Sequence, residues 1–237
     1  MRNEFLAIAT IAFASVAHAG DVGSTFRDAT GENSDPSLSN IDILNATFKN
    51  DATSLYLSVA VNADVSATNW GNYLVFIDRT PSIGALSDLN SRDPLNAPWD
   101  RRAGSPTGVD AFVSSWIDGD GGYLNSTWDG SAWTQNESGT PDLSQAASGI
   151  VSWTFSLASL GLSLGDTFYF DVATISDHDG ASGIDLLSVD VIQPGWKDDS
   201  ISGRNLTYTV ASSMPVPGIG GLAALAGFGL IRQRRRR

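Results

Sequence analysis

The chain has 237 residues, no cysteine, and 14 Lys and Arg against 26 Asp and Glu, which gives a formal net charge of −12. The lack of cysteine excludes a disulfide scaffold, a zinc–thiolate site and an iron–sulfur cluster. The acidic balance argues against nucleic acid as a partner, because phosphate binding needs a basic face.

The first 19 residues have the pattern of a secretory signal peptide. Arg2 precedes an apolar run over 5–17, and the small residues Ala17 and Ala19 flank His18 just before Gly20. A charged start, a short apolar helix and a small-x-small cleavage site together are typical of export signals. We therefore expect cleavage after Ala19; the alternative is a buried N-terminal helix.

Strands are predicted by period-two alternation of apolar and polar residues between turn residues. The clearest is 54–61, where Leu55, Leu57 and Val59 share one face. Residues 72–78 are apolar on both faces, which is typical of a central strand. The expected strands are 41–48, 54–61, 72–78, 109–117, 122–128, 131–135, 150–157, 167–175, 184–191 and 205–210.

These strands predict an all-β fold, an antiparallel β-sandwich of the jelly-roll or immunoglobulin-like kind, as one domain over 20–213. Strong hairpin turns at 118–121 and 129–130 predict a three-strand meander. Residues 156–162 are compatible with one helical turn. The long segment 79–108, rich in Pro, Asp, Asn and Arg, breaks the rhythm, and long loops on β scaffolds commonly carry binding sites.

The C-terminal segment 214–237 combines a proline motif, a short apolar run and a basic tail. Val216-Pro217-Gly218 precedes the apolar run 219–231, and Arg234, Arg235, Arg236 and Arg237 close the sequence. This order resembles the PEP-CTERM sorting signal of bacterial surface proteins, in which Val-Pro-Glu-Pro stands at the motif. The resemblance implies transient anchoring of a short hydrophobic helix in the inner membrane, with the arginines cytoplasmic, and removal by an exosortase-type protease.

An ordinary C-terminal anchor is the alternative, although the apolar run of 219–231 is shorter than the about 20 residues that a full span needs. Removal of both ends takes Lys and Arg from 14 to 8 and Asp and Glu from 26 to 25, so the net charge becomes −17.

A second resemblance lies within the predicted sandwich, in the segments 42–48, 55–59, 73–78 and 123–133. Their sequences resemble the sandwich shared by family 9 carbohydrate-binding modules and DOMON-like domains. In those domains a strand carrying Phe-Ile-Asp leads into a loop near a metal or ligand site. The resemblance implies such a position for Asp78.

Trp99 is the tryptophan that we select as a candidate ligand contact. It lies in the long loop beside Arg101 and Arg102, and a flat indole face stacks well on a sugar ring. The predicted contact set is Trp99, Asp78, Arg101 and Arg102. Trp153, by contrast, shares a strand face with apolar residues and is expected in the core.

Two acidic loops are candidates for calcium, which binds six to eight oxygens. Asp118 and Asp120 lie in a turn that resembles part of a calcium loop, but Tyr123 stands where an EF-hand needs glycine, so a plain hairpin is the alternative. Asp177 and Asp179, with Asp185, form the second acidic loop. The strongly negative charge favours a bound cation at either place.

Catalysis finds little support in the sequence. His178 is the one histidine outside the signal segment, no Gly-x-Ser-x-Gly motif is present, and no spacing selects a carboxylate pair. The sequence therefore favours a non-enzymatic, exported surface or extracellular-matrix protein that binds carbohydrate. The alternatives are a secreted hydrolase acting on polysaccharide, or a purely structural surface protein stabilised by calcium.

Overall fold

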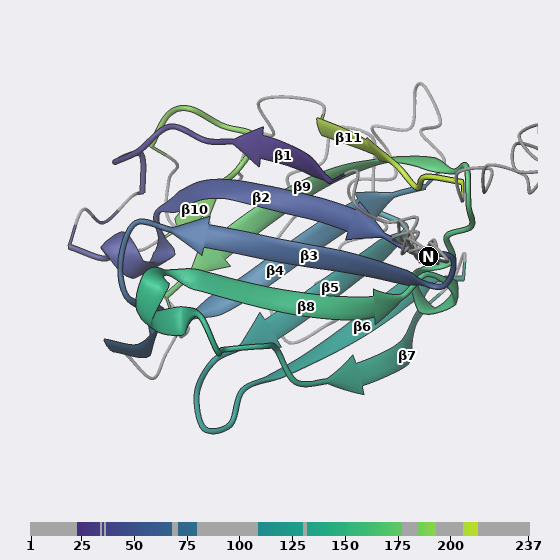
Figure 1. Ribbon diagram of the computed structural model, residues 1–237, viewed down its shortest axis with the longest axis horizontal. Helices are drawn as coiled ribbons and strands as arrows, with labels where there is room; N and C mark the ends of the chain where they lie inside the picture. Colours follow the sequence, from purple (N-terminus) through teal and green to yellow (C-terminus); the bar gives the residue numbers. More distant parts are fainter. Residues whose placement is uncertain are drawn as a thin grey trace, which may run out of the picture.

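Strands in which apolar and polar residues alternate form two antiparallel β-sheets that pack face to face (Figure 1). The computed structural model describes residues 23–33, 35, 37–67, 71–79, 109–129, 132–176, 184–192 and 206–212. The all-β prediction is confirmed. The expected signal helix and hydrophobic C-terminal helix lie outside the described residues. Within the described ranges, no helix has the length and apolarity that a membrane crossing requires.

In the part of the chain that the structure describes, the first sheet has four strands in the order β1-β2-β3-β8, all antiparallel. Its strands are β1 (Ser24–Arg27), β2 (Ile43–Asn50), β3 (Ser54–Val61) and β8 (Ile150–Ser156). The sequence did not predict β1, because four residues with one half-buried apolar side chain, Phe26, give too little alternation to recognise.

The second sheet has seven strands among the described residues, and its main path runs β10-β9-β4-β5-β6-β7. The long central strand β9 pairs with β4 on one edge and with both β10 and β11 on the other. The strands are β4 (Asn72–Asp78), β5 (Ala111–Trp116), β6 (Gly122–Trp128), β7 (Trp133–Gly139), β9 (Thr167–Ile175), β10 (Ile184–Leu186) and β11 (Leu206–Thr209).

The meander prediction is confirmed by the pairing of β5 with β6 and of β6 with β7. The expected bounds of β3, β4, β6 and β9 coincide with the observed ones. The strand expected at 184–191 is shorter, because β10 ends at Leu186 and a turn follows. The described residues also form short 3-10 turns: η1 (Ser39–Ile41), η2 (Val65–Ala67), η4 (Ala146–Ser148) and η5 (Ala158–Leu160).

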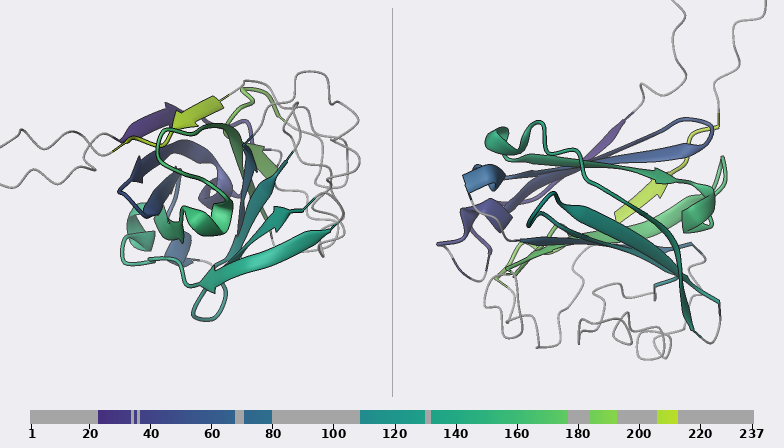
Figure 2. Two further views of the ribbon diagram at one scale, coloured as in Figure 1. Left: turned by 90° about the vertical axis from the view of Figure 1, so that its right-hand side faces the viewer. Right: turned by 90° about the horizontal axis from the view of Figure 1, so that it is seen from below.

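The main core lies between the two layers that the edge-on view in Figure 2 separates. Phe48 of β2 and Phe170 of β9 meet at 4.6 Å between ring centroids, within a wider aromatic cluster. Trp153 is buried as expected, and its Nε1 donates to the Ser115 hydroxyl of the opposite sheet at 2.9 Å. The burial of these apolar side chains between the two sheets is the main driving force for packing the sheets together.

A second, smaller cluster lies on the other face of the seven-stranded sheet. Leu74 and Phe76 of β4 belong to it, whereas Tyr73 and Val75 face the main core. The expectation that β4 is a central strand buried on both faces is therefore confirmed.

Polar contacts join the two sheets at both ends of β2. At its last residue, Asn50 Oδ1 accepts hydrogen bonds from the Tyr208 hydroxyl and the Ala211 backbone N–H, each at 2.8 Å. At its first residue, the Ile43 N–H donates to Asp185 Oδ2 at 2.5 Å. The second contact belongs to the acidic cluster described below.

Candidate functional site

A groove of about 460 Å³ lies on the outer side of the four-stranded sheet, and its lining includes residues of β3 and β8. These two strands are neighbours in the sheet (Figure 1). Tyr56, Ser58, Ser152 and Thr154 point outward there because they alternate with buried residues of both strands. The segment after β7 forms one wall, and its Asp142 bridges to Ser152. The lining residues are Tyr56, Leu57, Ser58, Tyr123, Thr140, Asp142, Ser152, Trp153 and Thr154.

Tyr56 presents the exposed aromatic ring of the groove, with 39% of its surface accessible. Its hydroxyl donates to Asp51 Oδ2 at 2.6 Å. Asp51 also accepts the backbone N–H groups of Thr53 and Ser54. These bonds, the one from Tyr56 above all, lower the pKa of Asp51 to about 2. Asp51 is therefore ionised at neutral pH, and its charge-assisted hydrogen bond with the Tyr56 hydroxyl restricts the orientation of the Tyr56 ring.

Hydroxyl and carboxylate groups line the same groove as the Tyr56 ring. The hydroxyls of Ser58 and Ser152 contact each other at 2.7 Å across the two strands. Asp142 is exposed, and hydrogen bonds from Ser144 lower its pKa, so it is ionised at neutral pH. The groove thus combines one aromatic face with several hydrogen-bonding groups.

Tyr123 fixes the side of the groove nearest the second sheet. Its hydroxyl contacts the Thr154 carbonyl oxygen at 2.9 Å and Glu137 Oε1 at 3.1 Å. Burial raises the pKa of Tyr123 to about 12. Because this contact joins β6 to β8, the groove is built on two strands that the sandwich core holds in place.

A cluster of three carboxylates lies at a different edge of the molecule. Asp28, Glu32 and Asp185 each contribute one carboxylate oxygen, and these oxygens lie within 4.8 Å of one another. Asp28 follows β1, Glu32 lies in the loop toward η1, and Asp185 is the middle residue of β10. Glu32 and Asp185 are buried, with exposed fractions of 6% and 1%.

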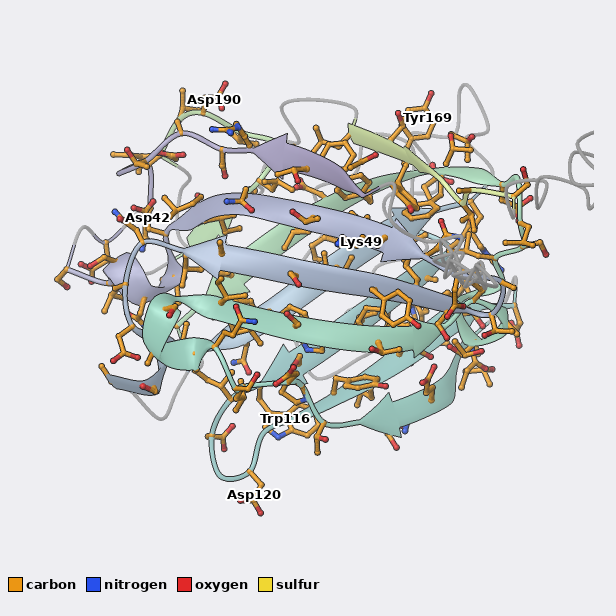
Figure 3. All side chains as sticks on the ribbon, in the orientation of Figure 1. Asp42, Lys49, Trp116, Asp120, Tyr169 and Asp190 are labelled. Atoms are coloured by element: carbon orange, nitrogen blue, oxygen red, sulfur yellow. The ribbon has the colours of Figure 1, made fainter. Side chains whose placement is uncertain are left out.

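Burial raises the pKa of Asp185 to about 7 and also raises the pKa of Glu32. Asp42 adds repulsion to both groups, and Asp190 adds to that on Glu32. Figure 3 shows Asp42 and Asp190 at the same end of the sandwich. The carboxylate of Asp42 is itself fixed, because it accepts the Gly31 N–H at 3.1 Å and the Asn62 amide at 2.9 Å.

The predicted ligand-contact set is only partly described. Asp78 is the last residue of β4 and is fully buried, with 0% exposure. Trp99, Arg101 and Arg102 lie outside the described residues, so that set stays a prediction.

The predicted calcium residues fall in two places. Asp118 and Asp120 are exposed in the turn between β5 and β6, and Figure 3 shows Asp120 at its outer tip. Asp177 and Asp179 lie outside the described residues, as do the sorting residues at 216–218 and 234–237 and the cleavage residues Ala17 and Ala19. Among the described residues, the acidic group that the fold assembles is the one at Asp185.

Sequence reasoning missed Asp28 and Glu32 as partners of Asp185. They precede the first recognised strand, and no spacing rule connects them to a residue so much later in the sequence. Their proximity depends on the edge strands β1 and β10, which are too short for strong alternation. Sequence reasoning also missed the groove, because in the sequence Tyr56 is one of several outward residues of β3 and nothing distinguishes it from the others.

No family model, no curated protein and no solved structure matches this chain. Its class is therefore defined by the fold itself: a two-sheet antiparallel β-sandwich with an open polar groove on one sheet and a carboxylate cluster at one edge.

Proposed function

We propose that this is an exported, non-enzymatic cell-surface or extracellular-matrix protein whose sandwich binds carbohydrate in the groove along β3 and β8. The observation that carries the proposal is the oriented, exposed ring of Tyr56 beside hydroxyl groups and the ionised Asp142. Sugar rings have one apolar face, which stacks on an aromatic ring, and a rim of hydroxyls, which bonds to polar side chains.

The net charge of the chain favours neutral over acidic polysaccharides as ligands. With its terminal segments removed, the chain carries a net charge of −17, which repels acidic polysaccharides at long range. Neutral polysaccharides are therefore the expected ligands.

A polysaccharide hydrolase remains the second candidate that the sequence raised. Glycoside hydrolysis usually needs two carboxyl groups that flank the scissile bond. Among the described residues that line the groove, Asp142 is the one carboxylate, and this favours binding over hydrolysis.

The terminal segments support the export part of the proposal. The signal pattern at 1–19 directs the chain out of the cytoplasm, and the PEP-CTERM-like segment 214–237 anchors it in the inner membrane until an exosortase-type protease removes that segment. The DOMON-like resemblance and the loop set Trp99, Arg101 and Arg102 are consistent with a further sugar contact.

Affinity electrophoresis of the exported protein in gels that contain soluble xylan, mixed-linkage β-glucan, galactomannan or dextran tests the binding site. We expect retardation by at least one of these polymers. Tyr56→Ala should weaken that binding about tenfold, the equivalent of about 1.4 kcal/mol, because it removes the stacking face.

Tyr169→Ala is the matched control, since Tyr169 is a half-buried tyrosine on β9 of the other sheet (Figure 3). It should bind as the unchanged protein does. Binding that survives Tyr56→Ala, or an equal loss in the control, would exclude this groove as the site. Release of reducing ends from any of the four polymers would instead support the hydrolase.

A further inference from the structure

We propose that Asp28, Glu32 and Asp185 bind a calcium ion that joins the edges of the two sheets. No part of this inference depends on carbohydrate binding, because the cluster lies at the β1 edge of the four-stranded sheet and the groove lies at the β8 edge.

The spacing and chemistry of the three groups suit a hard cation. Calcium binds carboxylate oxygens at 2.3–2.6 Å, so two oxygens that share one ion lie at most about 5 Å apart. The three oxygens here lie within 4.8 Å of one another. Three carboxylates, each able to bind through one or two oxygens, can supply most of the six to eight ligands that calcium requires, with water completing the shell.

Glu32 supplies an independent observation that points to a ligand. Its exposed fraction is 6%, and its Oε1 is buried with no hydrogen-bond partner. Buried carboxylate oxygens are normally hydrogen-bonded, paired or metal-bound, because their desolvation is costly. A cation bound by the Glu32 carboxylate would compensate for this desolvation.

The surroundings position Glu32 and favour a cation. Gly31 donates its N–H to both oxygens of Asp42, at 3.1 and 3.2 Å, and this contact holds the backbone next to Glu32. Asp42 thus acts as a positioning residue. Asp42 and Asp190 also add negative potential around Glu32, which attracts a divalent cation and disfavours three ionised carboxylates without one.

The ligands come from three separate segments, so an ion would act as a cross-link. Asp28 continues the edge strand β1 of one sheet, which has β2 as its strand partner, and Asp185 belongs to the edge strand β10 of the other sheet. Glu32 comes from the loop between β1 and η1. Calcium would therefore hold the segment 23–33 against the sandwich, where Asp185 already accepts the Ile43 N–H.

Calcium titration of the exported protein, stripped with EDTA and followed by isothermal calorimetry and thermal unfolding, tests the site. We expect one calcium per chain and an increase in melting temperature with calcium, as linkage requires for a ligand of the folded state. Magnesium should bind more weakly, because it demands shorter, octahedral coordination. Amide hydrogen exchange should slow in 23–33 when calcium is added.

Glu32→Gln keeps the size of the side chain and removes one charge, and it should lower calcium affinity at least tenfold. Asp120→Asn removes the same charge from the exposed β5–β6 turn and should bind calcium unchanged. Circular dichroism tests whether both variants fold. If Glu32→Gln does not fold, Asp28→Asn provides a second variant of a calcium ligand.

The proposal is overturned if the unchanged protein binds no calcium at millimolar concentration. It is equally overturned if a folded ligand variant keeps full affinity, or if Asp120→Asn is the variant that loses it, because calcium would then bind at the hairpin turn.

Discussion

Tyr73 illustrates how single polar atoms modify the stability of this core. Its ring is buried between the sheets, 5.3 Å from that of Trp153, and its hydroxyl has no hydrogen-bond partner. Burial strongly raises the pKa of this hydroxyl. A buried hydroxyl without a partner destabilises the folded state, because the unfolded chain hydrates the same group.

Tyr73→Phe should therefore increase the free energy of unfolding by about 1 kcal/mol, measured by urea denaturation at pH 7. In the unchanged protein, the unfolded tyrosine loses its proton near pH 10 whereas the folded one retains it, so stability falls as pH rises above about 10. The variant should show a shallower fall between about pH 10 and 11. Its slope will not vanish, because the pKa values of Tyr123 and Tyr208 are also raised.

Tyr169→Phe is the control, as a half-buried tyrosine outside the main core, and should change stability by less than about 0.5 kcal/mol. A Tyr73→Phe variant less stable than the unchanged protein would show that the hydroxyl has a stabilising partner.

At the scale of elements, the turn after η4 is fixed to the end of β3 by a glycine. Gly149 adopts φ of +74°, and a Cβ atom there would lie 2.5 Å from the Val61 carbonyl oxygen and 2.7 Å from that of Ala63. Val61 in turn donates its N–H to the Gly149 carbonyl oxygen at 2.8 Å. The backbone approach that joins β3 to the start of β8 thus requires glycine.

Gly149→Ala should cost the backbone strain of a left-handed residue, about 1–2 kcal/mol, plus at least about 1 kcal/mol for the overlap with backbone oxygens. Gly165→Ala separates the two effects, because Gly165 has φ of +90° but nothing within 4 Å of an added Cβ. Urea denaturation of both variants measures the difference. Equal losses would show that β3 and η4 separate easily enough to relieve the overlap.

At the scale of the whole molecule, charge is divided between the ends of the chain and its middle. The value of −12 combines the strongly acidic stretch 20–213, with a net charge of −17, with the arginine-rich end at 232–237. An acidic domain of this kind is kept soluble by self-repulsion, which also disfavours the compact state. Bound calcium at the β1–β10 edge would reduce the repulsion among Asp28, Glu32 and Asp185.

Mass spectrometry of the protein recovered from cells tests the proposed processing. We expect a chain that begins at Gly20 and lacks the segment after 213, and hence a more acidic protein than the full sequence implies. A native chain that still ends at Arg237 would exclude cleavage by an exosortase-type protease and leave the permanent anchor.

Local pattern was enough to predict most of the fold. The bounds of β3, β6 and β9 follow from alternation, and those of β4 follow from a run that is apolar on both faces. The β5–β6–β7 meander follows from its turn residues. These features are encoded within a few neighbouring residues, because side-chain direction in a strand has a period of two. The short strand β1 was missed since it carries too few residues to show that period.

The sequence by itself determined the fold class, the central position of β4 and the acidic character of the chain. Tertiary structure alone decided that Tyr56 lines a groove with Asp142, and that Glu32 meets Asp28 and Asp185. The physical reason is that pairing between edge strands and the packing of two sheets bring together residues that lie far apart along the chain. Such contacts cannot be predicted from a local sequence pattern. They are identified from burial and hydrogen bonding in the folded molecule.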